Sequence, residues 1–345
     1  MKENSKPFIS IVITGLNEEK NIERCLKSAL TQRYAKYEVI YVDGGSTDRT
    51  LSIVERIAMH YKNRLKVVVA HGSTPAEARN LGISISKGDI IAFLDADCKA
   101  PPSWIRKIAS KLVNADHTIA GIGGPYIIPE EYPWKVHAIF DTLNTLLGGN
   151  FLVQFARLKE PQIAYALPAG NSAYWKDDLL SVGGFDRRLR YCEDHLLGIK
   201  LSERGKCVLY DSELYVYHYC KVYGLLSFLK LMLRYGKGRA DAFFADRRLF
   251  SFVRIVPALS ILAFVALVVL FLLTESPLVR SVLITCSISY FTALTANTLR
   301  LILSNKDLRY AISFIVYLTE HIAYGVGMLI GVAQNTLAKL LGTLH

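Results

Sequence analysis

Two aspartates, one residue apart, end an apolar segment in the N-terminal third of the chain. Asp95 and Asp97 close the sequence IIAFLDAD, residues 90–97. In open α/β sheets, ligands bind beyond the carboxyl ends of the strands, and side chains two residues apart share a face of a strand. A carboxylate pair there could hold Mg²⁺ or Mn²⁺, which could in turn hold a diphosphate. The alternative is an ordinary loop that carries two acids.

A third carboxylate, Asp43, ends another expected strand in the sequence YVDGGSTD, residues 41–48. It could accept hydrogen bonds from a base N–H or a ribose hydroxyl, since Gly44 and Gly45 let the backbone turn tightly beside a ligand. It could equally cap the next helix. The chain has no GxGxxG pattern and no P-loop lysine, so a dinucleotide enzyme is disfavoured.

An arginine lies near the start of an expected helix, in the sequence ARNLG, residues 78–82. The planar, permanently charged guanidinium of Arg79 suits a base or a diphosphate. The alternative is a solvated helix arginine.

Two further acids, Glu193 and Asp194, open an expected helix in the sequence CEDH, residues 192–195. Acids at a helix N-terminus can simply complement the helix dipole. One could also be a general base, because a displacement that inverts an anomeric carbon needs a deprotonated acceptor hydroxyl. We favour Asp194 for this role, with Glu193 next.

Strand and helix patterns alternate over about the first 125 residues. Strands are expected at 8–13, 38–42, 65–70 and 90–94, and helices at 18–32, 46–61, 76–86 and 101–113. This alternation predicts right-handed βαβ units and a mostly parallel sheet. The doubly wound order places the first and fourth strands side by side, so residues 14–18 should lie beside 95–97. The segment 134–158 could be an interfacial helix pair or a lid.

The C-terminal part contains three segments long enough to cross a hydrocarbon core of about 30 Å. They lie at about 255–273, 281–303 and 310–333, and the last is apolar except around Glu320 and His321. Core helices of a soluble protein are the alternative. Ionisable groups near mid-bilayer are costly, so Glu320 and His321 are expected to form a structural pair or to meet a lipid phosphate. Residues 1–8 do not resemble a signal peptide.

The net charge of +11 is concentrated before the first apolar segment. Residues 221–254 hold eight basic and two acidic side chains. Such a cluster favours the cytoplasmic side and anionic headgroups. We therefore expect a cytoplasmic α/β domain at 1–220, a basic juxtamembrane segment at 221–252 and a three-helix membrane domain at 253–345, with the C-terminus on the far side. Nucleic-acid binding is disfavoured, and the six cysteines show no zinc spacing.

Taken together, the motifs resemble family 2 glycosyltransferases. TGLNEE, VDGGSTD, ARNLG, DAD, the Gly-Asn pair at 170–171, GGFD and the Glu-Asp pair occur in that family's order, and the resemblance covers about residues 8–240. It implies an inverting, metal-dependent enzyme with the GT-A fold, which is Rossmann-like.

The resemblance also implies roles for individual residues. Those that would bind the donor are Thr14, Asn17 and Glu18 in the base pocket, Asp43 and Arg79 at the nucleobase, and Asp95 at the ribose and metal. The remaining ones are Asp97 as the metal ligand, Gly170 and Asn171 at the acceptor, and Asp194 as the base. Some GT-A enzymes use a late histidine as a metal ligand, so His218 is a candidate, although a lone histidine is often structural.

Several departures from the family pattern bear on the donor, on processivity and on membrane attachment. Gly44 stands where the family often has a second acid, which leaves the identity of the nucleobase open. The acid that usually follows the Glu-Asp pair two residues on is absent, because residues 195–197 read HLL. The QxxRW element of processive synthases is absent, so transfer of one sugar is expected. Instead, residues 234–239 read RYGKGR and resemble a short basic helix of membrane-attached, non-processive relatives. Lys237 and Arg239 could steady a diphosphate or lipid headgroups, or act only as a positive-inside anchor.

The sequence therefore predicts a multi-pass plasma-membrane transferase with a cytoplasmic catalytic domain. It would move a sugar from a UDP- or GDP-linked donor to a hydroxyl of a lipid-linked saccharide or glycolipid, in surface glycan or glycoprotein assembly. A polyprenyl-phosphate sugar synthase is the nearest rival, but its acceptor is already ionised and has less need of a base. A processive synthase and a non-catalytic nucleotide-sugar-binding protein are further alternatives.

Overall fold

The structure of the chain is a computed structural model that describes residues 6–148, 155 and 158–342. The described residues form two compact units. One comprises Met1–Pro129 with Gln154–Cys220, and the other Glu130–Val153 with Lys221–His345. The first unit ends at Cys220, and the described residues from Glu130 to Gly148 belong with the C-terminal helices.

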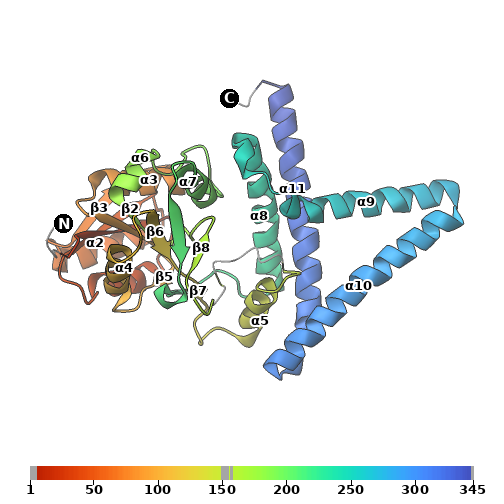
Figure 1. Ribbon diagram of the computed structural model, residues 1–345, viewed down its shortest axis with the longest axis horizontal. Coiled ribbons are helices and arrows are strands. Elements are labelled where there is room, and N and C mark those ends of the chain that lie inside the picture. Colours follow the sequence, from red (N-terminus) through yellow and green to blue (C-terminus); the bar gives the residue numbers. More distant parts are fainter. Residues whose placement is uncertain (1–5, 149–154, 156–157, 343–345) are drawn as a thin grey trace. The chain divides into compact units, whose positions relative to one another are not determined.

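A mostly parallel sheet forms the centre of the N-terminal unit (Figure 1). In the described residues its strand order is β3-β2-β1-β4-β9-β6-β10-β8. The strands are β1 (Ile9–Gly15), β2 (Tyr37–Asp43), β3 (Leu65–Val69), β4 (Ile90–Asp95), β6 (Ile119–Gly123), β8 (Gln162–Ala164), β9 (Asn171–Trp175) and β10 (Cys207–Tyr210). Strands β3, β2, β1 and β4 are parallel, and β9 lies antiparallel between β4 and β6.

Helices connect these strands, and a small second sheet lies beside the large one. The helices are α1 (Ile22–Leu30), α2 (Thr50–His60), α3 (Pro75–Ile85), α4 (Trp104–Val113), α6 (Lys176–Ser181) and α7 (Glu193–Ser202). The small sheet has the order β5-β11-β7, formed by β5 (Cys98–Lys99), β11 (Val216–His218) and β7 (Tyr126–Ile127). This arrangement confirms the predicted mixed α/β fold with a mostly parallel sheet.

Strand β1 lies between β2 and β4, so the first and fourth expected strands are neighbours, as the sequence predicts. Thr14 pairs with Asp95, and Gly15 pairs with Asp43. The carboxyl ends of these three strands therefore meet at one edge of the sheet. Residues 90–94 of β4 are all buried, as expected for a parallel strand covered on both faces.

Local capping explains where α2 and α3 begin. Helix α3 starts with a capping box, in which Thr74 accepts from the Glu77 amide at 3.2 Å and Glu77 accepts from the Thr74 amide at 2.8 Å. The expectation that the second helix starts at Ser46 is wrong, because Asp43 accepts from the amide and the hydroxyl of Ser46, both at 2.7 Å. Helix α2 begins only at Thr50.

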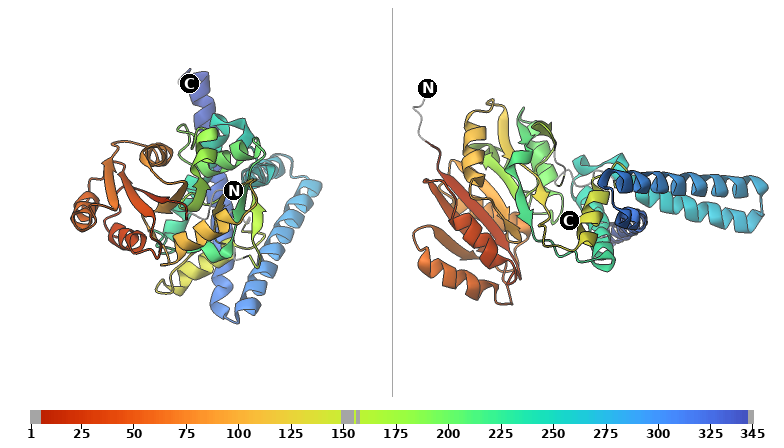
Figure 2. Two further views of the ribbon diagram at one scale, coloured as in Figure 1. Left: turned by 60° about the vertical axis from the view of Figure 1, so that its left-hand side comes forward. Right: turned by 90° about the horizontal axis from the view of Figure 1, so that it is seen from below.

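The C-terminal unit consists of helices. They are α5 (Trp134–Leu143), α8 (Leu225–Ala245), α9 (Phe252–Thr274), α10 (Pro277–Asn305) and α11 (Ser313–Leu340). Three of the described helical segments, α9, α10 and residues Leu308–Leu340, are long and apolar enough to cross a membrane. Figure 2 shows α9 and α10 leaving the rest of this unit together as a hairpin. Helix α5 occupies part of the segment 134–158, of which 149–154, 156 and 157 lie outside the described residues.

Candidate active site

Asp95 lies at the end of β4 and is held by two side chains. Its Oδ1 accepts from Arg79 Nη2 at 3.0 Å, and its Oδ2 accepts from the Tyr126 hydroxyl at 3.2 Å. The Tyr126 hydroxyl in turn accepts from the Gly170 amide at 3.0 Å. A Cβ atom on Gly170 would collide with the Asp95 carboxylate, so glycine is required for this close approach. Tyr126, which the sequence did not single out, thus fixes Asp95.

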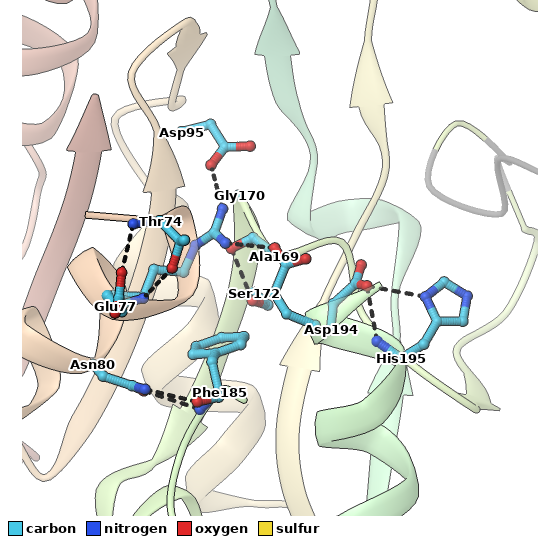
Figure 3. Close-up of polar contacts among 12 residues, drawn as sticks. Thr74, Glu77, Asn80, Asp95, Ala169, Gly170, Ser172, Phe185, Asp194 and His195 are labelled. Atoms are coloured by element: carbon cyan, nitrogen blue, oxygen red, sulfur yellow. Dashed lines mark hydrogen bonds and ion pairs between the residues drawn. The ribbon is translucent and has the colours of Figure 1, made fainter. Parts of the chain in front are cut away.

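Arg79 connects Asp95 to Glu193 at the start of α7. Figure 3 labels Asp95 after β4 and Asp194 at the start of α7. Arg79 Nη1 donates to Glu193 Oε1 at 2.7 Å, so one guanidinium bridges two carboxylates. Burial alone would lower the pKa of Arg79, but the charges of Asp95 and Glu193 outweigh burial and raise it. The guanidinium therefore stays charged inside the unit. The expected role of Arg79 in donor binding remains a prediction.

Glu193 and Asp194 are neighbours with opposite electrostatic environments. Burial raises the pKa of Glu193 and outweighs the lowering effect of Arg79. Asp194 Oδ1 accepts from the backbone amide of His195 at 2.8 Å and lies 3.0 Å from its Nδ1. Burial would raise the pKa of Asp194, but His195 outweighs it and keeps that pKa below its usual value. Asp194 is therefore ionised at neutral pH, as a general base must be.

The loop that precedes α7 is clamped to α3. Asn80 Nδ2 donates to the Phe185 carbonyl at 2.7 Å, and the Phe185 amide donates to Asn80 Oδ1 at 2.9 Å. Gly184 has a φ of +67°, which favours glycine. The Phe185 ring packs edge-on against Phe93 of β4, with 5.2 Å between ring centroids. The ARNLG and GGFD motifs thus position the Glu-Asp pair against the central sheet.

Asp97, Cys98 and His218 form a cluster whose potential ligand atoms all lie within 4.8 Å of one another. His218 Nε2 is 3.3 Å from Asp97 Oδ2, and Cys98 pairs with His218 between β5 and β11. Burial lowers the pKa of His218, but the charge of Asp97 outweighs it and raises that pKa. Burial raises the pKa of the Cys98 thiol, which favours its protonated form. Carboxylate oxygen and imidazole nitrogen remain as donors, and this set fits a divalent cation such as Mn²⁺.

The loops after β1 and β2 hold each other in place. Asp43 is buried and accepts from the Gly45 amide at 2.9 Å as well as from Ser46. Asn17 has a φ of +56°, and its Oδ1 accepts from the Thr47 amide at 2.9 Å. The Glu18 amide donates to the Thr50 hydroxyl at 2.7 Å. Contacts of Thr14, Asn17, Glu18 and Asp43 with a nucleobase remain predictions.

Of the other predicted site residues, one is buried within the N-terminal unit and two belong to the C-terminal unit. Asn171 is buried: its Oδ1 accepts from the Trp104 indole at 3.0 Å, and its Nδ2 donates to the carbonyls of Pro125 and Leu214 at 3.0 and 2.8 Å. Lys237 and Arg239 lie on α8 in the C-terminal unit. Lys237 pairs with Asp241 at 2.8 Å, and Arg239 is buried. Their contact with phosphate or headgroups, and that of Gly170 and Asn171 with an acceptor, stay predictions.

Comparison with known families and proteins gives consistent matches. The family model "Glycosyl transferase family 2" matches residues 10–176. Glycosyltransferase AglE of Haloferax volcanii is 26% identical over 249 residues, which are 70% of this chain and 76% of AglE.

A second relative comes from Methanococcus voltae. It is described as a dolichyl N-acetyl-alpha-D-glucosaminyl phosphate 3-beta-D-2,3-diacetamido-2,3-dideoxy-beta-D-glucuronosyltransferase. It is 30% identical over 123 residues, which are 34% of this chain and 38% of the relative. The chain thus matches little more than a third of that protein's length.

Among solved structures, the mannosyltransferase PcManGT from Pyrobaculum calidifontis, in complex with GDP-Man and Mn²⁺, is similar over most of the chain. The TM-score is 0.63 and the identity 18%, covering 94% of this chain and 88% of PcManGT. At this identity the match supports the fold.

Proposed function

We propose that this chain, whose residues 10–176 match the family 2 glycosyltransferases, transfers one sugar, with inversion, from a nucleotide-diphosphate donor to a hydroxyl of a lipid-linked saccharide or glycolipid. The product would enter a surface glycan or glycoprotein. The N-terminal domain, 1–220, would be catalytic and cytoplasmic, the segment 221–252 would lie next to the plasma membrane, and 253–345 would anchor the enzyme there.

A single observation carries this proposal: Arg79 joins Asp95 at the end of β4 to Glu193 at the start of α7. The Arg79 guanidinium lies 3.0 Å from Asp95 Oδ1 and 2.7 Å from Glu193 Oε1. A donor bound at the end of β4 and a base at the start of α7 would therefore share one site. Transfer in one step needs donor and base at the same anomeric carbon.

The residues divide the chemistry between them. Asp97 and His218 would hold Mg²⁺ or Mn²⁺, which supplies positive charge to the leaving nucleotide diphosphate when bound. Asp194 would take the proton from the acceptor hydroxyl as the oxygen attacks the anomeric carbon. His195 donates to Asp194 Oδ1, which orients the carboxylate and leaves its other oxygen for the acceptor.

The membrane context and the relatives support the choice of a lipid-linked acceptor. The chain has apolar helices of membrane-spanning length. The Methanococcus relative is named for a dolichyl-phosphate-linked sugar, and PcManGT holds GDP-Man and Mn²⁺. We therefore expect a UDP- or GDP-linked donor here.

The test uses the full chain in membranes, a panel of UDP- and GDP-sugars and extracted lipids, with products identified by mass spectrometry and anomeric configuration by NMR. Asp194→Asn should lower kcat by about 10²- to 10⁴-fold. The matched control is Asp177→Asn, an exposed acid on α6 that should leave kcat unchanged. Full activity of Asp194→Asn would refute the assigned base. A polyprenyl-phosphate monosaccharide as the product would refute the hydroxyl acceptor.

A further inference from the structure

Helices α8 and α11 of the C-terminal unit form a tightly packed parallel pair. Gly236 of α8 meets the Tyr324 carbonyl, and Gly327 of α11 meets the Leu233 carbonyl, so closely that a Cβ at either glycine would collide. About one turn further along, a Cβ on Gly331 would lie 2.7 Å from the Ala240 Cβ. The pair extends to Asn335, whose amide donates to Asp241 at 2.6 Å. Because the backbones are in contact, the two helices must occupy the same depth relative to a membrane.

Helix α8 is too charged to cross a hydrocarbon core. It carries Lys230, Arg234, Lys237, Arg239 and Asp241 within four turns. Charged side chains within a bilayer are costly and rare. The helix also starts only five residues after Cys220, where the N-terminal unit ends, so no earlier span separates them. Helix α8 therefore stays on the side of the N-terminal unit, and α11 must stay with it.

The burial of the helices also indicates that α11 differs from α9 and α10. Half of the most apolar stretch within Leu308–Leu340 is buried inside the protein, whereas only 6% of the corresponding stretch is buried in α9 and in α10. Glu320 of α11 is buried, and within the described part of the chain neither carboxylate oxygen has a hydrogen-bond partner. A carboxylate at that position would be very costly in mid-bilayer. Packing against protein therefore accounts for about half of the apolar stretch in α11.

Helices α9 and α10 each contain an uncharged stretch long enough to span a membrane, with a charged residue at either end. Residues 255–274 of α9 lie uncharged between Arg254 and Glu275, about 30 Å at 1.5 Å per residue. Residues 281–299 of α10 lie uncharged between Arg280 and Arg300, about 28 Å. Both match a hydrocarbon core of about 30 Å.

The path of α9 separates the hairpin from the paired helices. Pro257 and Ile261 of α9 contact α11 at Gly325. Figure 1 shows α9 then leaving the α8–α11 pair crosswise and α10 returning toward the start of α11. A hairpin crosswise to the pair can insert into a membrane while the pair lies along its surface.

We propose that only the α9–α10 hairpin crosses the bilayer, and that α8 and α11 lie together on the membrane surface that faces the N-terminal unit. Both ends of the chain are then on the same side, in place of the three spans that hydropathy predicts. The partner of α8 is an anionic lipid surface. Lys230 and Arg234 are exposed one turn apart, beside the exposed Leu226 and Leu229, and this mixture suits the boundary between headgroups and acyl chains.

The test places epitope tags in the full chain at three positions: before Met1, after Ser276 in the α9–α10 loop, and after His345. Antibody access is compared in sealed vesicles of both orientations. The proposal expects the two terminal tags on one side and the Ser276 tag on the other. A C-terminal tag on the side of the Ser276 tag would show three spans and overturn it. All three tags on one side would show that the hairpin does not cross, and would overturn it as well.

A depth measurement provides an independent check that does not depend on tags. Spin labels at Ile330→Cys on α11 and Phe264→Cys on α9 occupy exposed positions, and Cys286→Ser removes the exposed native thiol. Collision with oxygen and with a water-soluble nickel chelate reports depth. The label at 330 should lie at headgroup level and the label at 264 near the bilayer centre. Equal, deep positions for both labels would overturn the proposal.

Discussion

The bridge formed by Arg79 makes a quantitative prediction about stability. The variant Arg79→Met removes the guanidinium but keeps much of the side-chain volume. The Arg79 and Glu193 side chains are 7% and 10% exposed, so this is a buried pair, whereas Asp95 is 31% exposed and its share is screened by water. Removing one partner of a buried pair costs about 3–5 kcal/mol. Because the raised pKa of Glu193 lets it take up a proton, we expect a loss near the low end, about 3 kcal/mol.

Thermal unfolding in detergent, followed by intrinsic fluorescence, measures this loss. For a domain of about 150–250 residues, 1 kcal/mol corresponds to roughly 2–4 °C in Tm, so Arg79→Met should lower Tm by about 6–12 °C. The matched control is Arg56→Met, which breaks an exposed pair with Glu23 at 3.4 Å and should change stability by less than about 1 kcal/mol.

A double-mutant cycle separates the pair from a general packing defect. Glu193→Gln removes the buried charge. Arg79→Met should therefore reduce the free energy of unfolding by less in the Glu193→Gln background than in the wild type, with a coupling energy of about 1–3 kcal/mol. A Tm of Arg79→Met within 2 °C of the wild type, or additive effects in the cycle, would refute the reasoning that this bridge stabilises the N-terminal unit.

Three further predictions concern the same site. His218→Ala should raise the Mn²⁺ concentration needed for half-maximal transfer, and an unchanged metal titration would remove His218 from the metal site. Gly170→Ala should place a methyl group against the Asp95 carboxylate and reduce kcat/KM at least tenfold; wild-type activity would show that this approach is not required. The raised pKa of Glu193 means that its contribution to stability is fully present below pH 4.5 and is lost as pH rises through the folded-state pKa. Glu193→Gln should therefore flatten the decline in Tm above pH 4.5, and parallel curves for the variant and the wild type would count against this shift.

Sequence patterns predict the central strands well because β1, β2 and β4 are almost entirely buried. The four expected strands agree with β1 to β4 within about two residues, and the order of β1 and β4 follows from the doubly wound rule. The start of α2 was missed, because nothing in the local sequence shows that Asp43 binds the backbone of Ser46. The strands β5, β7 and β8 have two or three residues each, too few to produce a periodic pattern.

The site is predictable only where its residues follow strands. Asp43 ends β2 and Asp95 ends β4, the two strands on either side of β1, so topology alone brings them to one edge of the sheet. Tyr126 reaches Asp95 from the small second sheet, and no spacing along the chain indicates this contact. Cys98 follows Asp97 directly, but its place beside His218 depends on pairing between β5 and β11, which are more than 100 residues apart.

Arg79 shows most clearly why residue type and spacing cannot replace the three-dimensional arrangement. The sequence offers two roles for this side chain, a contact to the donor or a solvated position on a helix, and both assume that the guanidinium faces outward. The fold instead buries it between Asp95 and Glu193, which is 114 residues away in the chain. A ligand phosphate that reaches this guanidinium must then compete with two carboxylates, so any movement of Arg79 toward a donor would free Glu193 beside the candidate base. Binding of the donor and release of the acidic pair would be coupled through one side chain, and the coupling energy in the double-mutant cycle, measured with and without nucleotide, would show whether they are.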